Sequence, residues 1–381
     1  MSFTGKATYS AGATLPEIAE DVADLVAVNS PHETPLLDAL GDPARGARST
    51  VHEWIEDALL PNTDTLETFS VPDNEATVDH ADYFRVGDQI IVGDNTEVML
   101  VTAIDTIAGT LTVTRNYGGS GTGSVADGST IRILGNAALE GDEATPARFT
   151  SRQRSTNVTQ IFSATVEISG SELAVRQLGV RDELDYQKNQ RTRELLRDLE
   201  NCVINGVMPA ANPQGSSTVR RTMRGLMSFI ASNRFAPGVS GFPAGAALTE
   251  AQLNTALREM WKNSSGNVDL IVVGGPEKRA INSFITSSRR YNGSDETFKE
   301  LVAVYESDFG VCRVVLSRWV PAGTVLLLDS SRIEVMPLVG RSFHFKPLAA
   351  TGDRDAGQVI GEYTLELRNE TAHGVISGFS A

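Results

Sequence analysis

The first candidate for a chemical site is the pair His52 and Glu53, which matches the first two positions of the zinc-binding motif H-E-x-x-H. In that motif two histidines bind the metal and the glutamate acts as a general base. The fifth position here is Glu56 and not a second histidine. One imidazole with two carboxylates is a poor metalloprotease site, so we favour a strand whose Trp54 packs inward.

Two glycine-rich segments resemble phosphate-binding loops only in part. Residues 118–124 (GGSGTGS) fit neither the dinucleotide-binding nor the Walker pattern, and we expect a flexible hairpin tip there. Gly274 and Gly275 lie between an expected strand and an expected helix. However, Pro276 follows, Glu277 would stand where a phosphate sits, and the Lys-Ser/Thr pair is missing. No nucleotide site is predicted.

The other candidate groups are scattered. The histidines occur singly, at His32, His52, His80, His344 and His373. His373 is the strongest candidate for a base, but a lone histidine beside a glycine is more often a packing or turn residue. Asp353 and Asp355 lie in a turn without apolar surroundings that would raise a carboxyl pKa. Cys202 and Cys312 are too few for a disulfide framework or a zinc site and are expected to be buried thiols. We predict no catalytic, cofactor-binding or metal-binding residue, and no enzyme.

Size and composition are those of an ordinary globular protein. The chain has 381 residues, of which 41% are hydrophobic and 21% charged, and its net charge is −15. No apolar run reaches the roughly 18 residues of a membrane-spanning helix. The polar first ten residues lack a signal-peptide core, so we expect the chain to be made and used inside the cell. The negative charge argues against binding phosphates across the whole surface, but not against enclosing DNA without gripping it.

The first half of the chain is expected to form an extended arm followed by a β-rich insert. Residues 1–75 predict an extended arm with short helical pieces at 15–28 and 34–40. Residues 76–148 predict a small barrel or sandwich, because β-branched runs alternate with Gly, Asp and Asn turns. Its expected strands are residues 84–92, 97–105, 109–115 and 130–134.

The second half predicts a strand followed by long helices. Residues 157–169 are a run of strand formers, and residues 182–205 form the strongest helical pattern, with Asp182 as N-cap and Gly206 as the stop. A second amphipathic helix covers residues 248–261 and is capped by Thr249. Its inward residues are expected to be Leu253, Leu257, Met260 and Trp261. Residues 268–273 then read as a buried strand.

The order of several short phrases resembles a known family. Residues 305–310 (YESDFG), 350–353 (ATGD) and 362–374 (EYTLELRNETAHG) follow one another near the end. They are similar to the closing segment of tailed-phage major capsid proteins with the Hong Kong 97 fold. Residues 221–226 (RTMRGL) and 269–275 (DLIVVGG) resemble further phrases of that family. The resemblance covers about residues 15–75 and 150–381, outside the β-rich insert.

The resemblance implies an α+β, Hong Kong 97-type capsid fold with an inserted small all-β subdomain. The implied parts are an N-terminal arm (1–75), the inserted β-barrel or sandwich (76–148), an extended-loop hairpin (149–180), a peripheral domain with a spine helix (181–247), an axial domain (248–340) and C-terminal strands completing the peripheral domain (341–381). In the Hong Kong 97 phage, Lys–Asn isopeptide bonds link the subunits. We do not extend this cross-linking to the present chain, because no Lys, Asn and catalytic Glu can be matched.

The implied function is a major capsid protein that self-assembles through pentamers and hexamers into the icosahedral head of a tailed double-stranded DNA phage. It would be located in the virion after assembly in the host bacterial cytoplasm. Its partners would be further copies of itself, a portal protein, and scaffolding and decoration proteins, without a membrane. Packaged DNA would be enclosed without sequence-specific binding. The alternatives are an encapsulin-type nanocompartment shell, a hydrolase or nucleotide-binding protein, and a decoration or tail protein.

Overall fold

The structure, a computed structural model, describes residues 33–70, 74–141, 143, 147–175, 182–288, 304–349 and 352–380. The chain divides into two units, Met1–Trp54 with Arg154–Ala381, and Ile55–Gln153. We call them the larger unit and the barrel unit. The predicted helix at residues 15–28 lies outside the described residues. None of the described helices is long and apolar enough to cross a membrane.

The larger unit contains a six-stranded mixed sheet built around two fully buried strands, β11 (Leu270–Val273) and β14 (Thr324–Leu328). Continuous apolar runs of this kind suit strands that are covered on both faces. β11 runs parallel to one neighbour, β13, and antiparallel to the other, β14. The sheet order is β10 (Arg234–Phe235), β18 (Gly374–Ser377), β14, β11, β13 (Gly310–Leu316) and β12 (Val304–Ser307).

Two helices accompany this sheet. α5 (Glu250–Asn263) begins with the predicted Thr249 cap, where Thr249 and Gln252 exchange side-chain and backbone hydrogen bonds. α6 (Gly275–Ser288) follows β11 directly. Leu253, Leu257 and Met260 of α5 are buried as predicted, but the inward prediction for Trp261 is wrong. Trp261 is 65% exposed, because the core-facing stripe ends with Met260 and the next residue lies about 100° further round the helix.

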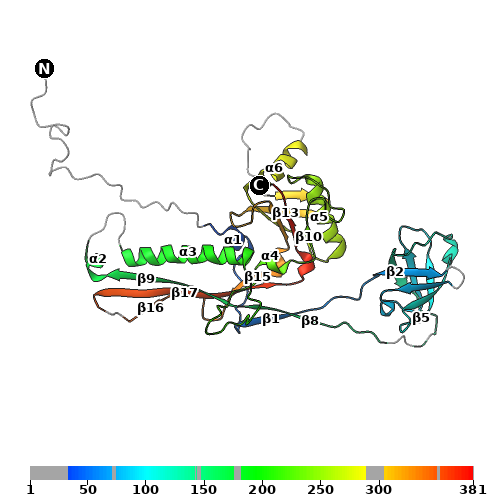
Figure 1. Ribbon diagram of the computed structural model, residues 1–381, viewed down its shortest axis with the longest axis horizontal. Coiled ribbons are helices and arrows are strands. Elements are labelled where there is room, and N and C mark those ends of the chain that lie inside the picture. Colours follow the sequence, from blue (N-terminus) through cyan, green and yellow to red (C-terminus); the bar gives the residue numbers. More distant parts are fainter. Residues whose placement is uncertain are drawn as a thin grey trace, which may run out of the picture. The chain divides into compact units, whose positions relative to one another are not determined.

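A second sheet lies under the longest helix. Its strands are β9 (Gln160–Ser169), β17 (Arg354–Leu367), β15 (Ile333–Pro337) and β16 (His344–Pro347), and α3 (Glu183–Asn205) runs alongside β9 and β17 (Figure 1). β9 and β17 pair antiparallel over ten residues each, from Tyr363 opposite Gln160 to Arg354 opposite Ser169. Phe162 of β9 and Leu195 and Leu199 of α3 share one apolar cluster. The helix and the sheet therefore form two packed layers.

Both ends of α3 lie where the sequence predicts them, but the glycine at the C-terminal end differs in conformation from the usual stop. Asp182 accepts a hydrogen bond from the Asp185 amide at 3.0 Å, which confirms it as N-cap. Gly206 ends the helix with φ −56°, so it does not adopt the left-handed conformation of the usual glycine stop. A Cβ on Gly206 would lie 2.4 Å from the Cys202 carbonyl oxygen and 2.7 Å from that of Met223. The glycine is needed because two backbones meet there.

The arm and the returning chain form a separate two-stranded ribbon. α1 (Pro35–Leu40) precedes β1 (Val51–Glu56), which pairs with β8 (Gln153–Val158). Trp54 is buried as predicted. The extended-loop hairpin predicted for residues 149–180 is wrong, because β8 pairs with β1 and β9 pairs with β17. Strand-forming residues identify a strand, but its partner depends on long-range packing.

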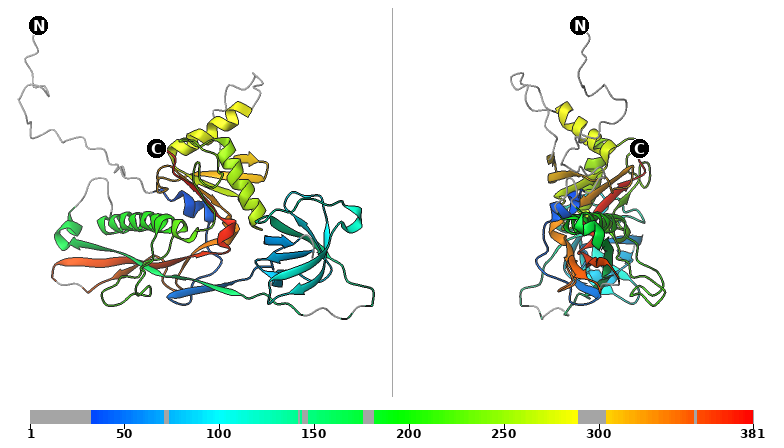
Figure 2. Two further views of the ribbon diagram at one scale, coloured as in Figure 1. Left: turned by 45° about the vertical axis from the view of Figure 1, so that its right-hand side comes forward. Right: turned by 90° about the vertical axis from the view of Figure 1, so that its left-hand side faces the viewer.

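The barrel unit is a closed six-stranded barrel with its own apolar core, and the left view of Figure 2 shows its strands from a further side. Around the barrel, the order is β2 (Thr63–Ser70), β3 (Glu75–Val78), β6 (Thr110–Thr114), β5 (Met99–Asp105), β4 (Asp88–Val92) and β7 (Thr130–Asn136). The four predicted strands are confirmed with shifted ends. β2 and β3 were missed, so the barrel begins before residue 76, inside the predicted arm. β2 was missed because polar Asp and Thr residues obscure its alternation.

The domain boundaries also differ from those expected in the larger unit. Residues 341–381 were expected to complete one domain together, but β16 and β17 lie in the sheet beside α3, whereas β18 lies in the six-stranded sheet. β15 was assigned to the axial part, yet it pairs with β17. Short elements complete the unit: α2 (Gly170–Ala174), α4 (Leu226–Phe229), η3 (Ser330–Arg332) and η4 (Glu370–Ala372). The barrel unit holds η1 (Ala81–Tyr83) and η2 (Tyr117–Gly119).

We predict that Gly206→Ala lowers the free energy of unfolding of the unassembled chain by about 2 kcal/mol or more, because the new Cβ overlaps two backbone carbonyls. Gly135→Ala is the matched control, since a Cβ there meets nothing within 4 Å and its φ is not positive. Denaturant titration measures both variants. Equal stability of the two variants would contradict the close approach at the end of α3.

Candidate functional site

The most distinctive arrangement of charged groups is a row of buried carboxylates on β17. Leu365 and Leu367 belong to the apolar core, whereas Glu362 and Glu366 occupy the alternate positions and are 3% and 1% exposed. A buried carboxylate is strongly destabilising unless donors surround it. The row therefore requires cationic or hydrogen-bonding partners from other segments.

Glu366 is matched by three basic side chains. The Arg45 guanidinium donates to both carboxylate oxygens at 2.9 Å, and His52 Nε2 lies 2.5 Å from Oε2. Nε of Arg368 lies 2.8 Å from Oε1. Arg45 and His52 come from the segment around β1. Glu366 therefore attaches the arm to β17.

Glu362 is matched by residues from three further segments. Arg221, in the loop after α3, donates to Oε1 at 2.5 Å, and the Thr159 hydroxyl donates to the same atom at 2.6 Å. Nε of Arg341 lies 2.8 Å from Oε2. Asn157 continues the contact by donating to the Leu365 carbonyl oxygen at 2.8 Å. Glu362 therefore joins the loop after α3 and the start of β9 to β17.

Glu370 closes the row just beyond the strand. Its Oε1 accepts hydrogen bonds from the backbone amides of Ala231 and Ser232 at 2.5 and 2.7 Å, and Oε2 accepts from the Ser232 hydroxyl at 2.8 Å. Asn369 before it adopts φ 52°, a left-handed conformation that asparagine tolerates. The acids in residues 362–374 thus form ion pairs and hydrogen bonds that connect segments distant in the sequence.

Glu200 performs a similar task on α3. Its side chain is fully buried and accepts from the amides of Leu36 and Leu37, at 3.0 and 2.9 Å. These amides begin α1, where helical N–H groups lack partners within the helix. The Ser317 hydroxyl, 3.3 Å away, donates as well. Burial raises the pKa of the Glu200 carboxyl, while these hydrogen bonds oppose the shift.

His373 is a packing residue, as predicted. It is fully buried; its Nδ1 accepts from the Asp329 amide and its Nε2 donates to the Arg368 carbonyl oxygen, each at 3.3 Å. Burial lowers the pKa of His373 to about 4. The ring is therefore neutral near pH 7, and neither nitrogen is available as a base.

The structure does not assemble a zinc site from the first candidate motif. His52 Nε2 is directed at Glu366, whereas Glu53 pairs with Arg154 at 3.2 Å. Adjacent side chains on a strand point to opposite faces, so the two residues cannot share a metal in β1. The strand interpretation is therefore the better one.

Neither glycine-rich segment is shaped for phosphate. Glu277, 3% exposed, accepts from the Gly323 amide at 3.1 Å, and its Oε2 lies 2.9 Å from the position that a Cβ on Gly274 would take. The start of α6 therefore already holds a carboxylate. Lys278 donates to the Val314 carbonyl oxygen at 3.1 Å, and burial lowers its pKa.

The loop at residues 118–124 was expected to be a flexible hairpin tip, but hydrogen bonds at Gly123 hold it to the barrel. Glu97, 1% exposed, accepts from the Arg115 guanidinium at 2.9 and 2.6 Å and from the Gly123 amide at 2.7 Å. The Arg115 hydrogen bonds hold the pKa of Glu97 below its usual value. The glycines let the backbone approach this buried pair.

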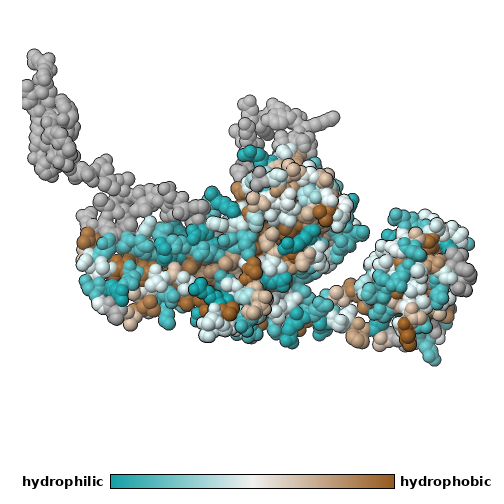
Figure 3. Space-filling view, viewed as in Figure 1, coloured by the Kyte–Doolittle hydropathy of each residue, from teal (hydrophilic) through white to brown (hydrophobic). Residues whose placement is uncertain are grey.

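The remaining candidates stay apart. Cys202 is half-buried and Cys312 buried, and burial raises the pKa of both thiols, to about 11 for Cys312. A high thiol pKa leaves little reactive thiolate. Asp353 and Asp355 are exposed at one end of β17. The outward surface of α3 is hydrophilic (Figure 3).

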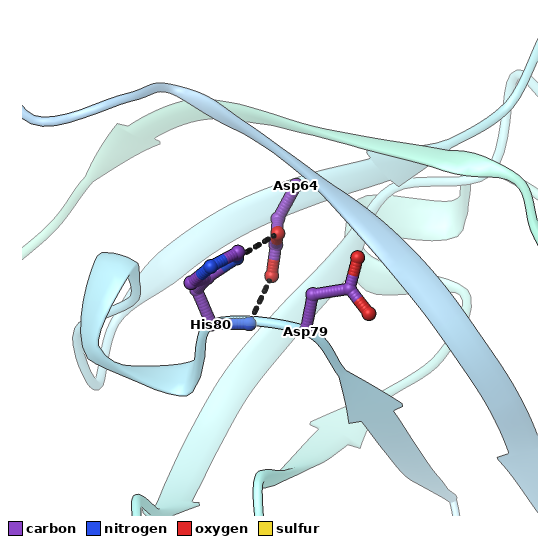
Figure 4. Close-up of side chains that lie close together, drawn as sticks. All are labelled: Asp64, Asp79 and His80. Atoms are coloured by element: carbon purple, nitrogen blue, oxygen red, sulfur yellow. Dashed lines mark hydrogen bonds and ion pairs between the residues drawn. The ribbon is translucent and has the colours of Figure 1, made fainter.

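Sequence reasoning missed one cluster, in the barrel unit. His80 Nδ1 lies 3.1 Å from Asp64 Oδ1, the His80 amide donates to Oδ2 at 2.8 Å, and Asp79 lies beside them (Figure 4). Among the described residues it is the one group with ligand atoms close enough to hold a metal. The hydrogen bond to Asp64 raises the pKa of His80, and the ring stacks on Tyr83. An ion pair accounts for the contact without a metal.

We predict that Glu366→Gln lowers the free energy of unfolding by about 2 to 4 kcal/mol, because it leaves Arg45, His52 and Arg368 around a neutral amide. Glu53→Gln is the matched control. Its carboxylate belongs to a half-exposed pair with Arg154, so the loss should stay within about 0.5 kcal/mol. Denaturant titration of unassembled chains compares them, and similar losses would contradict the proposed fastening by Glu366.

His373 predicts an acid-sensitive component of stability. The unfolded histidine takes up its proton near its ordinary pKa of 6.5, but the folded one only near 4. The contribution of neutral His373 to the free energy of unfolding is fully present above pH 6.5. As the pH falls toward 4, on the order of 3 kcal/mol of it is lost. Unfolding free energies should therefore fall more steeply with acid in the parent than in His373→Gln. The exposed His344→Gln should keep the parent slope; equal slopes in all three would disprove the assignment.

Comparison with known proteins adds the family context. The model of a family described as SU10 major capsid protein matches residues 3–380. No curated protein sequence matches the chain. Solved structures with a similar fold include the capsid of a native GTA particle, with TM-score 0.56, 11% identity and 100% of both chains covered. The Cyanophage A-1(L) capsid matches with TM-score 0.53, 12% identity, and 96% of this chain and 98% of that chain covered.

An encapsulin also matches, less well. The SrpI encapsulin complex from Synechococcus elongatus PCC 7942 has a TM-score of 0.43 and 12% identity, covering 61% of this chain and 78% of that chain. That score is too low to favour an encapsulin. The capsid matches over nearly the whole chain confirm the Hong Kong 97-type fold predicted from the sequence.

Proposed function

The chain belongs to the SU10 major capsid protein family, and we propose that its copies assemble through pentamers and hexamers into the icosahedral head of a tailed double-stranded DNA phage. The match over residues 3–380 carries this proposal. The described groups support a structural role, since the acids of β17 and of the turn after it hold segments together. We propose no catalytic activity.

The two sheets of the larger unit suit different tasks in such a shell. We assign the six-stranded sheet with α5 and α6 to the axial domain, and the second sheet with α3 to the peripheral domain. The β1–β8 ribbon, with the barrel unit inserted in its sequence, would serve as the extended loop. Head-to-tail contacts between axial domains close into rings. Exposed Trp261 and Val311 offer apolar surface for such a contact.

Partners and location follow from the same proposal. Assembly takes place in the host bacterial cytoplasm, a portal protein occupies one vertex, and scaffolding or decoration proteins bind during or after assembly. DNA is enclosed without sequence-specific binding. A net charge of −15 opposes extensive binding of its phosphates as well. Many modest contacts add up to a stable shell through multivalency.

Negative-stain electron microscopy of the purified chain, over a range of protein and salt concentrations, tests assembly. We expect closed shells, rings of five or six subunits, or sheets of rings. Co-expression with the neighbouring genes of its source genome provides a scaffold if one is needed. A chain that stays monomeric even then would overturn the proposal, and shells that enclose a cargo enzyme in place of DNA would favour the encapsulin alternative.

A further inference from the structure

The longest open sheet edge in the described structure belongs to β9. β17 pairs with one side of this ten-residue strand, and within the described residues no other backbone pairs with its second side. An unprotected edge is a template for another strand. The loop at residues 214–222 lines a hollow together with Gln160 and Ile161, at the start of the strand. In the part of the chain that the structure describes, no strand covers the edge from Phe162 onward.

The other described edges are short or charged, as natural proteins make edges that must stay unpaired. β10 has two residues and β12 has four. The six-residue strands β1 and β8 carry two glutamates and an arginine, respectively. β16 has four and contains Lys346 and Pro347. The barrel is closed and has no edge. β9, by contrast, contains no proline or lysine, and Glu167 is its one charged residue. The absence of such protection indicates that the edge has a partner.

We propose that the partner is β9 of a second copy of this chain, paired antiparallel about a two-fold axis through Thr165. This inference rests on the proposed shell function and names one of its contacts. Rings close by head-to-tail contacts, so joining two rings requires a further contact, and a two-fold contact uses the same surface of both copies. Strand addition supplies such a contact through backbone hydrogen bonds.

The sequence of β9 is self-complementary in this register. Phe162, Val166 and Ile168 are buried on the α3 side, whereas Ser163, Thr165 and Glu167 are exposed on the other. Pairing about Thr165 places Phe162 opposite Ile168, Ala164 opposite Val166, and Ser163 opposite Glu167. Both α3 helices then lie on the same face of one continuous sheet. Apolar residues meet apolar residues, and the two Glu167 carboxylates are not placed opposite each other.

Disulfide trapping tests the register with a matched pair of variants. Thr165→Cys places two thiols directly opposite, with Cα atoms about 5 Å apart, within disulfide range. Ser163→Cys is on the same exposed face, but its two copies would be offset by about 13 Å along the strands, too far to bond. We expect assembled Thr165→Cys to yield disulfide-linked dimers on oxidation, and Ser163→Cys to yield no more than the parent. Absence of dimers from Thr165→Cys shells overturns the proposal.

A charge pair tests the contact without a cross-link. Ser163→Glu sets a carboxylate opposite the neighbour's Glu167 twice in each contact, whereas Ser163→Lys sets an ammonium there. We expect the glutamate variant to form rings but to need at least about 5-fold more protein to form shells. The lysine variant should assemble like the parent, and Ser163→Glu with Glu167→Lys should regain assembly. Equal assembly of the two single variants overturns the contact.

The same experiment separates this inference from the proposed function. If the parent forms shells and the Ser163 variants do not differ, only the two-fold contact is wrong. If the parent forms no shells with its neighbouring genes co-expressed, the proposed function fails and the contact fails with it. Thermal unfolding of the isolated variants is the control for folding. We expect each substitution to leave the subunit folded, because the substituted positions are exposed.

Discussion

The requirement that a buried carboxylate be fully paired governs the construction of the larger unit. Glu362 and Glu366 of β17 are almost without exposure, so each fixes the basic side chains that surround it. Those side chains come from the arm, from the loop after α3 and from the segment before β16. Removing any one segment would take away part of the basic surroundings that a buried carboxylate in another segment requires. The capsid subunit thereby obtains a single arrangement of segments that also share one apolar cluster.

β17 is suited to this task because its two faces differ. One face contributes leucines to the core beneath α3, and the other carries the acids. The chain then turns through η4 and enters the six-stranded sheet as β18. His373 lies at this turn, bonded to the backbone near β14 and at the end of β17. One continuous segment therefore links the two sheets, and the neutral imidazole fixes the joint.

Local features of this chain could be predicted from sequence, whereas long-range partners could not. Asp182 and Thr249 cap their helices because capping depends on neighbouring residues. The pairing of β8 with β1 depends on segments nearly a hundred residues away, so the predicted hairpin was wrong. The acids of β17 were visible as part of a family phrase. Alternation of glutamate with leucine in a strand ordinarily predicts that the polar face is exposed to solvent. The burial of Glu362 and Glu366 depends on basic partners that are scattered through the sequence.

The placement of the barrel between β1 and β8 has an evolutionary consequence. The barrel has its own core and closed hydrogen bonding, and it interrupts the chain between two strands that pair with each other. Such a graft needs only that its two ends lie close together, and the entropy of closing the connection grows slowly with the length inserted. Lineages could therefore exchange, enlarge or discard this module without redesigning the lattice. The same tolerance makes the position a natural site for displaying a foreign domain.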